Sequence, residues 1–343
     1  MRTLGQFFAA ICAVLFILGT VAVLVFINVE AKAFSSETYK QAFEDQRLYE
    51  RMPPILATAL ITSMGPNISA VPFLQTLTIE DWQATISTLL PPEELKAMAN
   101  NALDATFDYL NNRTNSAVIS LTPVKVQLAG PSGMNVVLQI LSLQPACTTE
   151  QLTQMALGLL GGEIALCNPP PEAIGLMTPF IQSQLQTMTT IIPNEITFIP
   201  GTLSGTPDDP RLRLNTIRSA IKLTPFLPLL LLVGITIFAV RGLTDWLTWW
   251  GWPLAIAGAA SVIIGLAGAP LIGWILQLLI QNQATSLIPP AFISSIGETT
   301  TAVARQMLLP VLIQGAILGM IGLGMATLSM FLPRRQAPLY PPY

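Results

Sequence analysis

The sequence predicts a mainly α membrane protein with four transmembrane helices, arranged as one plus three. Between the first and second helices it predicts a mostly helical extracytoplasmic α domain with a small β part. Two observations predict this class. Hydrophobic residues make up 52% of the 343 residues and charged residues only 10%, whereas about a quarter of the residues of an ordinary soluble domain are charged. The chain also contains four long apolar segments without Asp, Glu, Lys or Arg, and about 20 such residues cross the hydrocarbon core as a helix. The lipid bilayer is therefore the first expected partner.

The first apolar segment, residues 7–27, predicts an N-terminal transmembrane anchor within residues 1–29. Ala31-Lys32-Ala33 has the small-x-small pattern of a signal-peptidase site. However, the apolar segment exceeds the roughly 7 to 15 residues of a cleaved signal, and Glu30 lies between the segment and the site. We expect an uncleaved anchor, with a cleaved signal as the alternative.

The remaining apolar segments, 223–240, 253–280 and 307–332, predict a three-helix transmembrane region over residues 209–333, with an outer loop at 281–306. Residues 334–343 form a predicted tail on the same side of the membrane as the N-terminus. Between the second and third segments lie four tryptophans, which we expect at the level of the lipid headgroups as an interfacial anchor. They are Trp246, Trp249, Trp250 and Trp252.

The arginines that flank the apolar segments predict the orientation. Four of them lie on one side of the membrane, in short segments where the positive-inside rule is most reliable: Arg2, Arg241, Arg334 and Arg335. This places both termini in the cytoplasm of a multi-pass plasma-membrane protein and residues 30–208 outside. Four basic residues on the outer flank of the second segment oppose this orientation: Arg211, Arg213, Arg218 and Lys222.

Small residues recur along two of the apolar segments and predict close helix packing. In the third segment they recur every four residues, at Ala257, Ser261, Gly265, Ala269 and Gly273. In the fourth segment Gly315 and Gly319 form a GxxxG pair. Such faces let two backbones approach closely in lipid, where helix association depends on van der Waals contact. We expect the two faces to pack against each other, with a homo-oligomeric interface as the alternative.

The sequence predicts a mostly helical domain between the first and second spans. Helical patterns begin at Ser35 or Ser36, at Ile55 after an interruption at Met52-Pro53-Pro54, and after the Thr78–Asp81 capping-box pair. Further helices are expected at 92–110, 134–143, 149–160 and 173–191. Residues 118–128 and 195–199 are rich in β-branched residues, and they predict a small strand pair that must accommodate Pro123 at an edge or bulge.

Cys147 and Cys167 are the only cysteines outside the apolar segments. In an oxidising compartment we expect them to form a disulfide worth about 3 kcal/mol by loop-closure entropy. In a reducing compartment they would be two buried thiols. Their spacing matches no metal-binding signature, and no cofactor or metal is expected.

The composition excludes several classes of function. Histidine is absent, which rules out histidine general bases, histidine-containing triads and histidine-ligated zinc or haem. A net charge of −3 provides no basic field for nucleic acid. No acid or base lies within the apolar segments to bind an ion or relay protons, which disfavours an ion-coupled transporter. The acidic pair Glu93 and Glu94 is explained by the favourable dipole of a helix N-terminus.

The densest polar cluster follows the first span and is the candidate partner surface: Tyr39, Lys40, Tyr49, Glu50 and Arg51. Helical spacing predicts an ion pair between Lys40 and Glu44 rather than a catalytic group. The segments Phe34-Ser35-Ser36-Glu37-Thr38-Tyr39-Lys40 and Tyr49-Glu50-Arg51-Met52-Pro53 resemble an uncharacterised group of bacterial membrane proteins with a single anchor and a helical outer domain. That resemblance implies kinship without an assigned activity.

Two functions follow from these observations. The first is a non-enzymatic membrane protein whose outer domain binds a protein partner, a second copy or an envelope component, with the helical bundle as anchor. The second rests on layout alone, since one span, a large outer domain and three further spans are similar to permease subunits of the FtsX and MacB type. Such a mechanotransmission subunit would work with a separate ATPase, although residues 241–252 are shorter than the coupling helix of those families.

Overall fold

The structure, a computed structural model, describes residues 2–64, 77–158, 167–201, 205, 209–283 and 290–332. The chain divides into two compact units. Unit 1 contains Met1–Thr38, Pro207–Leu276 and Thr300–Tyr343, and unit 2 contains Tyr39–Thr206 and Gln277–Thr299. The predicted tail at 334–343 lies outside the described residues.

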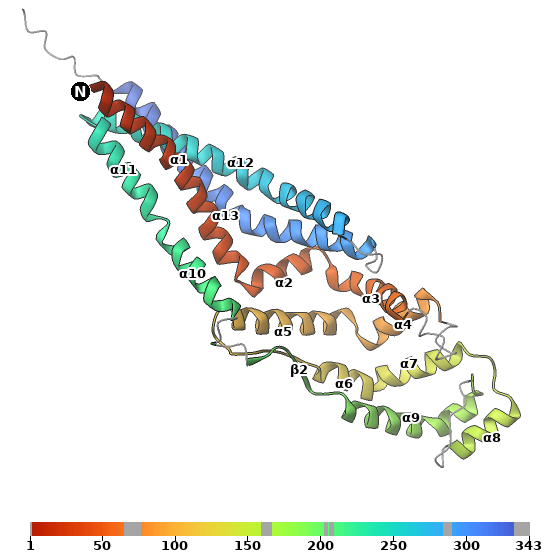
Figure 1. Ribbon diagram of the computed structural model, residues 1–343. Helices are drawn as coiled ribbons and strands as arrows, with labels where there is room; N and C mark the ends of the chain where they lie inside the picture. Colours follow the sequence, from red (N-terminus) through yellow and green to blue (C-terminus); the bar gives the residue numbers. More distant parts are fainter. Residues whose placement is uncertain are drawn as a thin grey trace, which may run out of the picture. The chain divides into compact units, whose positions relative to one another are not determined.

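Unit 1 holds the transmembrane segments. Four helical spans in the described residues are long and apolar enough to cross a membrane, as the sequence predicts. They are formed by α1 (Arg2–Ala33), the consecutive helices α10 (Pro210–Leu223) and α11 (Phe226–Ala239), α12 (Leu243–Gln283) and α13 (Pro290–Phe331). The helix α1 runs alongside α11 (Figure 1). The side chains of Phe16, Ile235 and Leu254 form one core cluster between these helices, and a second cluster surrounds Val311.

The third and fourth spans are longer than their apolar segments suggested. The helix α12 continues to Gln283 and α13 begins at Pro290, so residues 290–306 of the predicted loop at 281–306 are helical. Serines, threonines and other polar residues in this part of α13 lower its hydropathy. The apolar segment alone therefore underestimated the length of the helix.

The tryptophan cluster lies within the first turns of α12 rather than in a turn before it. The Trp246 and Trp250 rings are 5.1 Å apart, and Trp250 Nε1 donates a hydrogen bond to Thr236 Oγ1 on α11 at 3.1 Å. Trp249 packs against the Phe16 cluster, while Trp252 is 47% exposed. The cluster thus contributes to helix packing, and Trp252 remains on the outside of the bundle.

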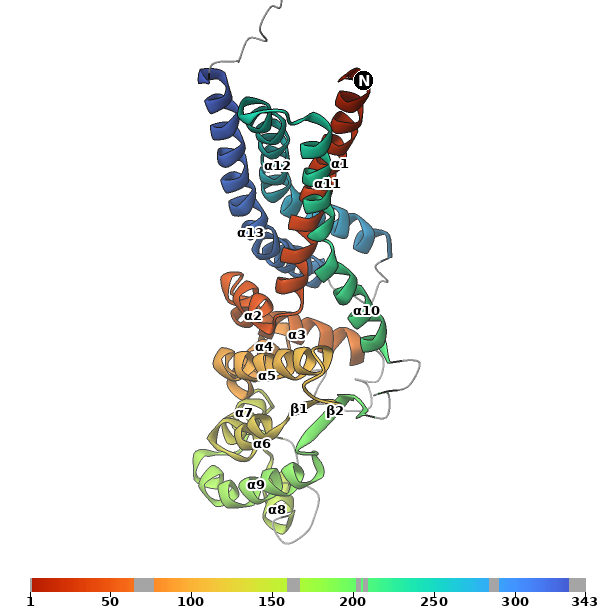
Figure 2. The same ribbon diagram turned by 90° about the vertical axis from the view of Figure 1, so that its left-hand side faces the viewer.

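Unit 2 is built mainly from helices that stack in successive layers, α5, then α6 with α7, then α9 (Figure 2). The helices are α2 (Ser36–Asp45, which starts in unit 1), α3 (Leu48–Met64), α4 (Ile79–Leu89), α5 (Pro92–Leu110), α6 (Thr122–Ala129), α7 (Pro131–Ser142), α8 (Thr149–Gly158) and α9 (Pro171–Ile191). On α9, residues 177, 181 and 185 are spaced four apart and buried. They form a core with Leu141 and Cys167.

A two-stranded antiparallel sheet completes unit 2. Strand β1 (Ala117–Ser120) pairs with β2 (Glu195–Ile199), with Val118 opposite Thr197 and a register shift between Ala117 and Val118. The second predicted β segment is therefore correct. The first is correct only at its start, because residues from Thr122 onward form α6, with Pro123 in the first helical turn where its missing N–H costs nothing.

One predicted helix cap is confirmed. Thr78 and Asp81 form the predicted capping box. At the start of α10 the Asp209 side chain also accepts the Arg211 backbone N–H. The expected break at Met52-Pro53-Pro54 was wrong. The helix α3 runs through both prolines, and the break lies earlier at Arg47, which takes a left-handed φ of 47°.

Candidate functional site

The predicted partner surface lies where α2 and α3 pack against α5 within unit 2. Lys40 Nζ is 2.7 Å from an Asp104 carboxylate oxygen, and the Tyr39 ring is 4.9 Å from the Phe107 ring. The Tyr49 hydroxyl donates to Asn100 Oδ1 at 3.3 Å. These side chains therefore contribute to joining the helices of the domain.

The charged members of the same cluster also have partners in the chain. Glu44 pairs with Lys96 of α5, so the expected ion pair between Lys40 and Glu44 is replaced by two pairs to that helix. Arg51 pairs with Glu298 at 2.6 Å. Glu50 remains exposed. Of the five predicted surface residues, Glu50 is the one whose side chain is most available to a partner.

Two tyrosines of this surface, Tyr39 and Tyr49, have raised pKa values. Burial raises the pKa of the Tyr39 hydroxyl. Burial, and secondarily the nearby Glu44 carboxylate, raise the pKa of the Tyr49 hydroxyl. Both tyrosines are therefore neutral hydrogen-bonding and packing groups at physiological pH, unsuited to act as general bases.

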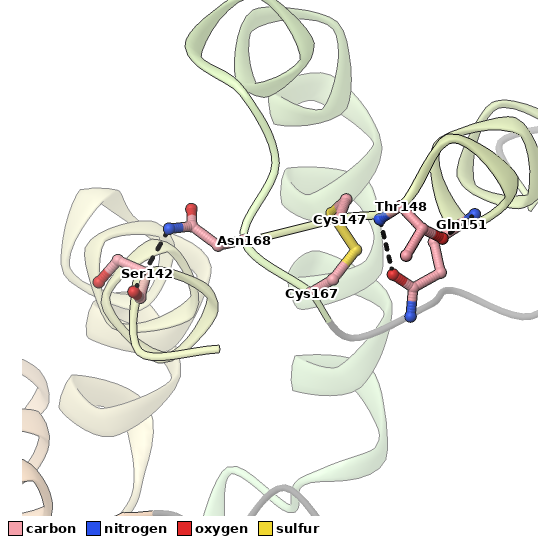
Figure 3. Close-up of a disulfide and its surroundings, with 6 residues drawn as sticks. All are labelled: Ser142, Cys147, Thr148, Gln151, Cys167 and Asn168. Atoms are coloured by element: carbon pink, nitrogen blue, oxygen red, sulfur yellow. Dashed lines mark hydrogen bonds between the residues drawn. A yellow bond between two sulfur atoms is a disulfide. The ribbon is translucent and has the colours of Figure 1, made fainter. Parts of the chain in front are cut away.

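The predicted disulfide is present. Cys147 and Cys167 are joined at an S–S distance of 2.03 Å, next to the helix that Thr148 begins (Figure 3). The Gln151 backbone N–H donates to Thr148 Oγ1 at 3.2 Å, and Gln151 Oε1 accepts the Thr148 backbone N–H at 2.9 Å, so that this reciprocal pair caps α8. Cys167 is 2% exposed and belongs to the core formed with α9. The disulfide ties the α8 segment to the core of unit 2.

The end of α9 and strand β2 expose four large apolar side chains that the sequence reading did not single out. We call them the apolar strip: Met188, Ile191, Ile196 and Phe198, with exposed fractions of 55%, 80%, 47% and 40%. Ile196 and Phe198 are two residues apart in β2 and lie on one face of the strand. A useful signal was present, since residues 188–199 contain several β-branched residues and a single charge, Glu195.

Strand β2 is an edge strand in the part of the chain that the structure describes, because the sheet consists of β1 and β2 alone. Its start is held in place by α6. Lys125 Nζ donates to the Ile192 carbonyl at 3.0 Å and to Asn194 Oδ1 at 2.6 Å, and the Leu121 N–H donates to the Asn194 carbonyl at 2.7 Å. An edge strand beside exposed apolar side chains can accept a further strand from another chain.

Known proteins do not identify this surface. Neither family models, curated proteins nor solved structures gave a significant match to this chain. Within the described residues, no three or more cysteine, aspartate and glutamate side chains come together as a metal site. The exposed side chains and the open strand make the apolar strip on the β2 edge the candidate functional site.

The small-residue faces of α12 and α13 meet each other in unit 1. A Cβ placed on Gly258 would lie 2.3 Å from the Gly319 backbone nitrogen, and one on Gly315 would lie 2.6 Å from Ser261 Cβ. A Cβ on Gly273 would lie 2.1 Å from Thr301 Oγ1. Ala257, Ser261 and Ala269 are buried, while the third-span face also includes Gly251 and Gly258, which the four-residue spacing missed.

Two polar contacts in unit 1 were also missed. Asn28 Nδ2 donates to Gln314 Oε1 at 2.8 Å, linking α1 to α13. Arg218 Nε donates to Glu30 Oε1 at 2.6 Å, and the guanidinium lies 4.6 Å from the centre of the Phe34 ring. The only sequence signal for the first contact was a glutamine inside an apolar span, which a search for charged residues overlooks.

Proposed function

We propose that this chain is a non-enzymatic, multi-pass plasma-membrane protein whose domain between the first and second spans binds another protein outside the cytoplasm. The observation that carries the proposal is the apolar strip on the β2 edge. Apolar groups gathered on a surface mark interaction sites when they lie together beside an unpaired strand edge.

The chemistry of this surface favours a protein partner over a sugar or a lipid headgroup. A partner segment in extended conformation would satisfy the backbone groups along the open edge of β2 and bury Ile196 and Phe198. The contacts from Lys125 and Leu121 hold the start of β2 before a partner arrives. Such preorganisation lowers the entropy cost of binding.

Two further observations support the orientation in which this domain is extracytoplasmic. The disulfide between Cys147 and Cys167 fits an oxidising compartment. Of the four basic residues that opposed the orientation, Arg211 is paired with Asp209 at 2.8 Å and Arg218 with Glu30. Both arginines therefore have structural roles, which accounts for their presence on the outer flank.

Co-purification of the intact protein after mild detergent extraction tests the proposal. Ile196→Lys and Phe198→Lys place a charge on the β2 edge, and Leu176→Lys is the matched control. Leu176 is 75% exposed and lies on the same helix as Ile191, about 22 Å away along its axis. We expect a specific partner with the wild type and with Leu176→Lys, and its loss with both β2 variants.

Two results would count against the proposal. One is a protein that purifies alone, and the other is a partner retained equally by all the variants. An ATPase that crosslinks to residues 241–252 would instead support the permease-like alternative.

A further inference from the structure

The level at which α1 leaves the hydrocarbon core is marked by polar contacts in unit 1. Glu30 and Lys32 follow Asn28 within four residues, and Glu30 is bonded to Arg218 of α10. Charged groups of this kind lie at or beyond the membrane interface. The hydrogen bond between Asn28 and Gln314 places Gln314 of α13 at the same depth in the membrane as Asn28.

Ser261 marks the same depth on α12. Gly315 follows Gln314 and lies against Ser261 of α12. From Ser261 to Leu276, α12 continues for fifteen residues, or about 22 Å. The contact between Gly273 and Thr301 keeps α13 beside it over this length. We call residues 263–276 and 300–313 the distal hairpin.

The α12 side of the distal hairpin presents an apolar face. Ile263 and Leu266 are each 65% exposed, Leu271 is 53% exposed and Trp274 is 60% exposed. Ile256, two helical turns before Ile263, is 48% exposed on the same face of α12. The lipid-facing surface of the bundle therefore continues without a charge beyond the level where α1 has ended its span.

The α13 side of the distal hairpin has a different character. It carries Thr300 and Thr301, and the Arg305 side chain is exposed. An ionised arginine at the centre of a bilayer costs about 2.5 to 3.5 kcal/mol. Leu309 and Ile313 on this side are also 51% and 50% exposed. The hairpin therefore carries one charge, Arg305, on an otherwise apolar surface, and that charge favours the membrane interface over the bilayer centre.

We propose that the distal hairpin binds the surface of the leaflet at the C-terminal end of α1. The α12 face lies against the acyl chains, Trp274 lies at the level of the headgroups, and Arg305 reaches the phosphates. Pro270 and Pro310 lie inside the two helices at this level. Each removes a helical hydrogen bond and permits a bend out of the direction of the bundle. The occupant of the apolar face is the lipid surface, because this face continues the one that already contacts lipid.

Site-directed spin labelling of the full chain in liposomes tests this inference. Nitroxides are placed one at a time at Leu266, Leu271 and Trp274 after Cys12→Ser, while the native disulfide keeps the other two cysteines unreactive. Collision rates are measured with oxygen, which concentrates in lipid, and with a water-soluble nickel chelate. Ile11, exposed on α1, is the lipid reference, and Ser183, exposed on α9 of unit 2, is the water reference.

The expected oxygen-to-nickel ratio at all three positions is severalfold above that at Ser183 and approaches that at Ile11. A ratio equal to that at Ser183 would show that the hairpin projects into water. Exclusion of both reagents would show that a second copy or another protein covers the face. Either result overturns the proposal, and because all three labelled side chains are exposed, misfolding of one variant leaves two independent readings.

Discussion

At the scale of single residues, the amide pair of Asn28 and Gln314 shows how the bundle treats polar groups. The side chain of Gln314 faces outward from α13, where lipid offers no hydrogen-bond partner. Asn28 is 8% exposed, bonds back to the Leu24 carbonyl at 2.7 Å and supplies the partner that Gln314 needs. The pair therefore satisfies two amides and links α1 to α13.

The two amides of this pair should be energetically coupled. We expect Asn28→Leu to lower the stability of the protein in detergent by about 0.6 to 1.7 kcal/mol, the range measured for such bonds in membranes. Asn28→Leu with Gln314→Leu should cost less than the sum of the two single variants. Thermal unfolding of the four proteins of this double-mutant cycle measures the coupling. Strictly additive effects would mean that the two amides do not interact.

The disulfide is the second feature decided by individual residues. Cys147→Ser removes a crosslink between residues twenty apart and should destabilise unit 2 by about 3 kcal/mol. We expect a lower thermal midpoint and faster proteolysis of the domain, while Cys12→Ser leaves both unchanged. Unreduced peptide mapping of protein from native membranes provides a separate check. Free thiols at both positions there would contradict the disulfide and the extracytoplasmic placement together.

Residue-level predictions from the sequence succeeded where partners are close along the chain. Thr78 and Asp81 are three residues apart, and the two cysteines outside the spans had only each other as partners. The pair of Glu30 with Arg218 joins residues 188 apart. No local pattern specifies such a contact, so it emerges only when α1 and α10 are brought together.

At the scale of elements, the packing of α12 on α13 depends on positions without a side chain. The contacts of Gly258 leave no room for a Cβ, whereas a Cβ on Gly324 of α13 would meet nothing within 4 Å. Both glycines lie in transmembrane helices, but only Gly258 is in close contact with the backbone of a neighbouring helix. They form a matched pair for substitution.

We expect Gly258→Ala to destabilise the protein by about 1 to 3 kcal/mol, the usual cost of overpacking. Gly324→Ala should be neutral or slightly stabilising, because alanine favours a helix more than glycine does. Thermal unfolding in one detergent measures both. Equal effects of the two substitutions would show that close contact of the backbones is not required.

The sequence predicted the type of most elements better than their extent. Apolar length identified four spans, but polar residues at the start of α13 concealed the helix that begins at Pro290. Residues 118–128 have the composition of a strand, yet Thr122 and Pro123 begin a helix. In both cases, the local signals for where a helix starts were stronger than the composition of the segment.

At the scale of the whole molecule, the described spans and the disulfide account for a membrane protein with a crosslinked domain between its first and second spans. The candidate partner surface at Tyr39 to Arg51 was inferred from local charge density. The structure uses most of those side chains within unit 2, since their complements on α5 lie some fifty to sixty residues further along the chain. The composition of residues 188–199 was a signal for the apolar strip, but the exposure of its side chains depends on the tertiary fold and does not follow from composition.

The central claim, that the β2 edge binds a protein, is tested most directly by photocrosslinking in native membranes. A photoreactive amino acid at Phe198 is compared with one at Leu176, which is more exposed but lies away from the edge. We predict a discrete crosslinked protein from position 198 only, competed by the unlabelled wild-type protein. Identical products from both positions, or crosslinks to lipid alone at position 198, would contradict the claim.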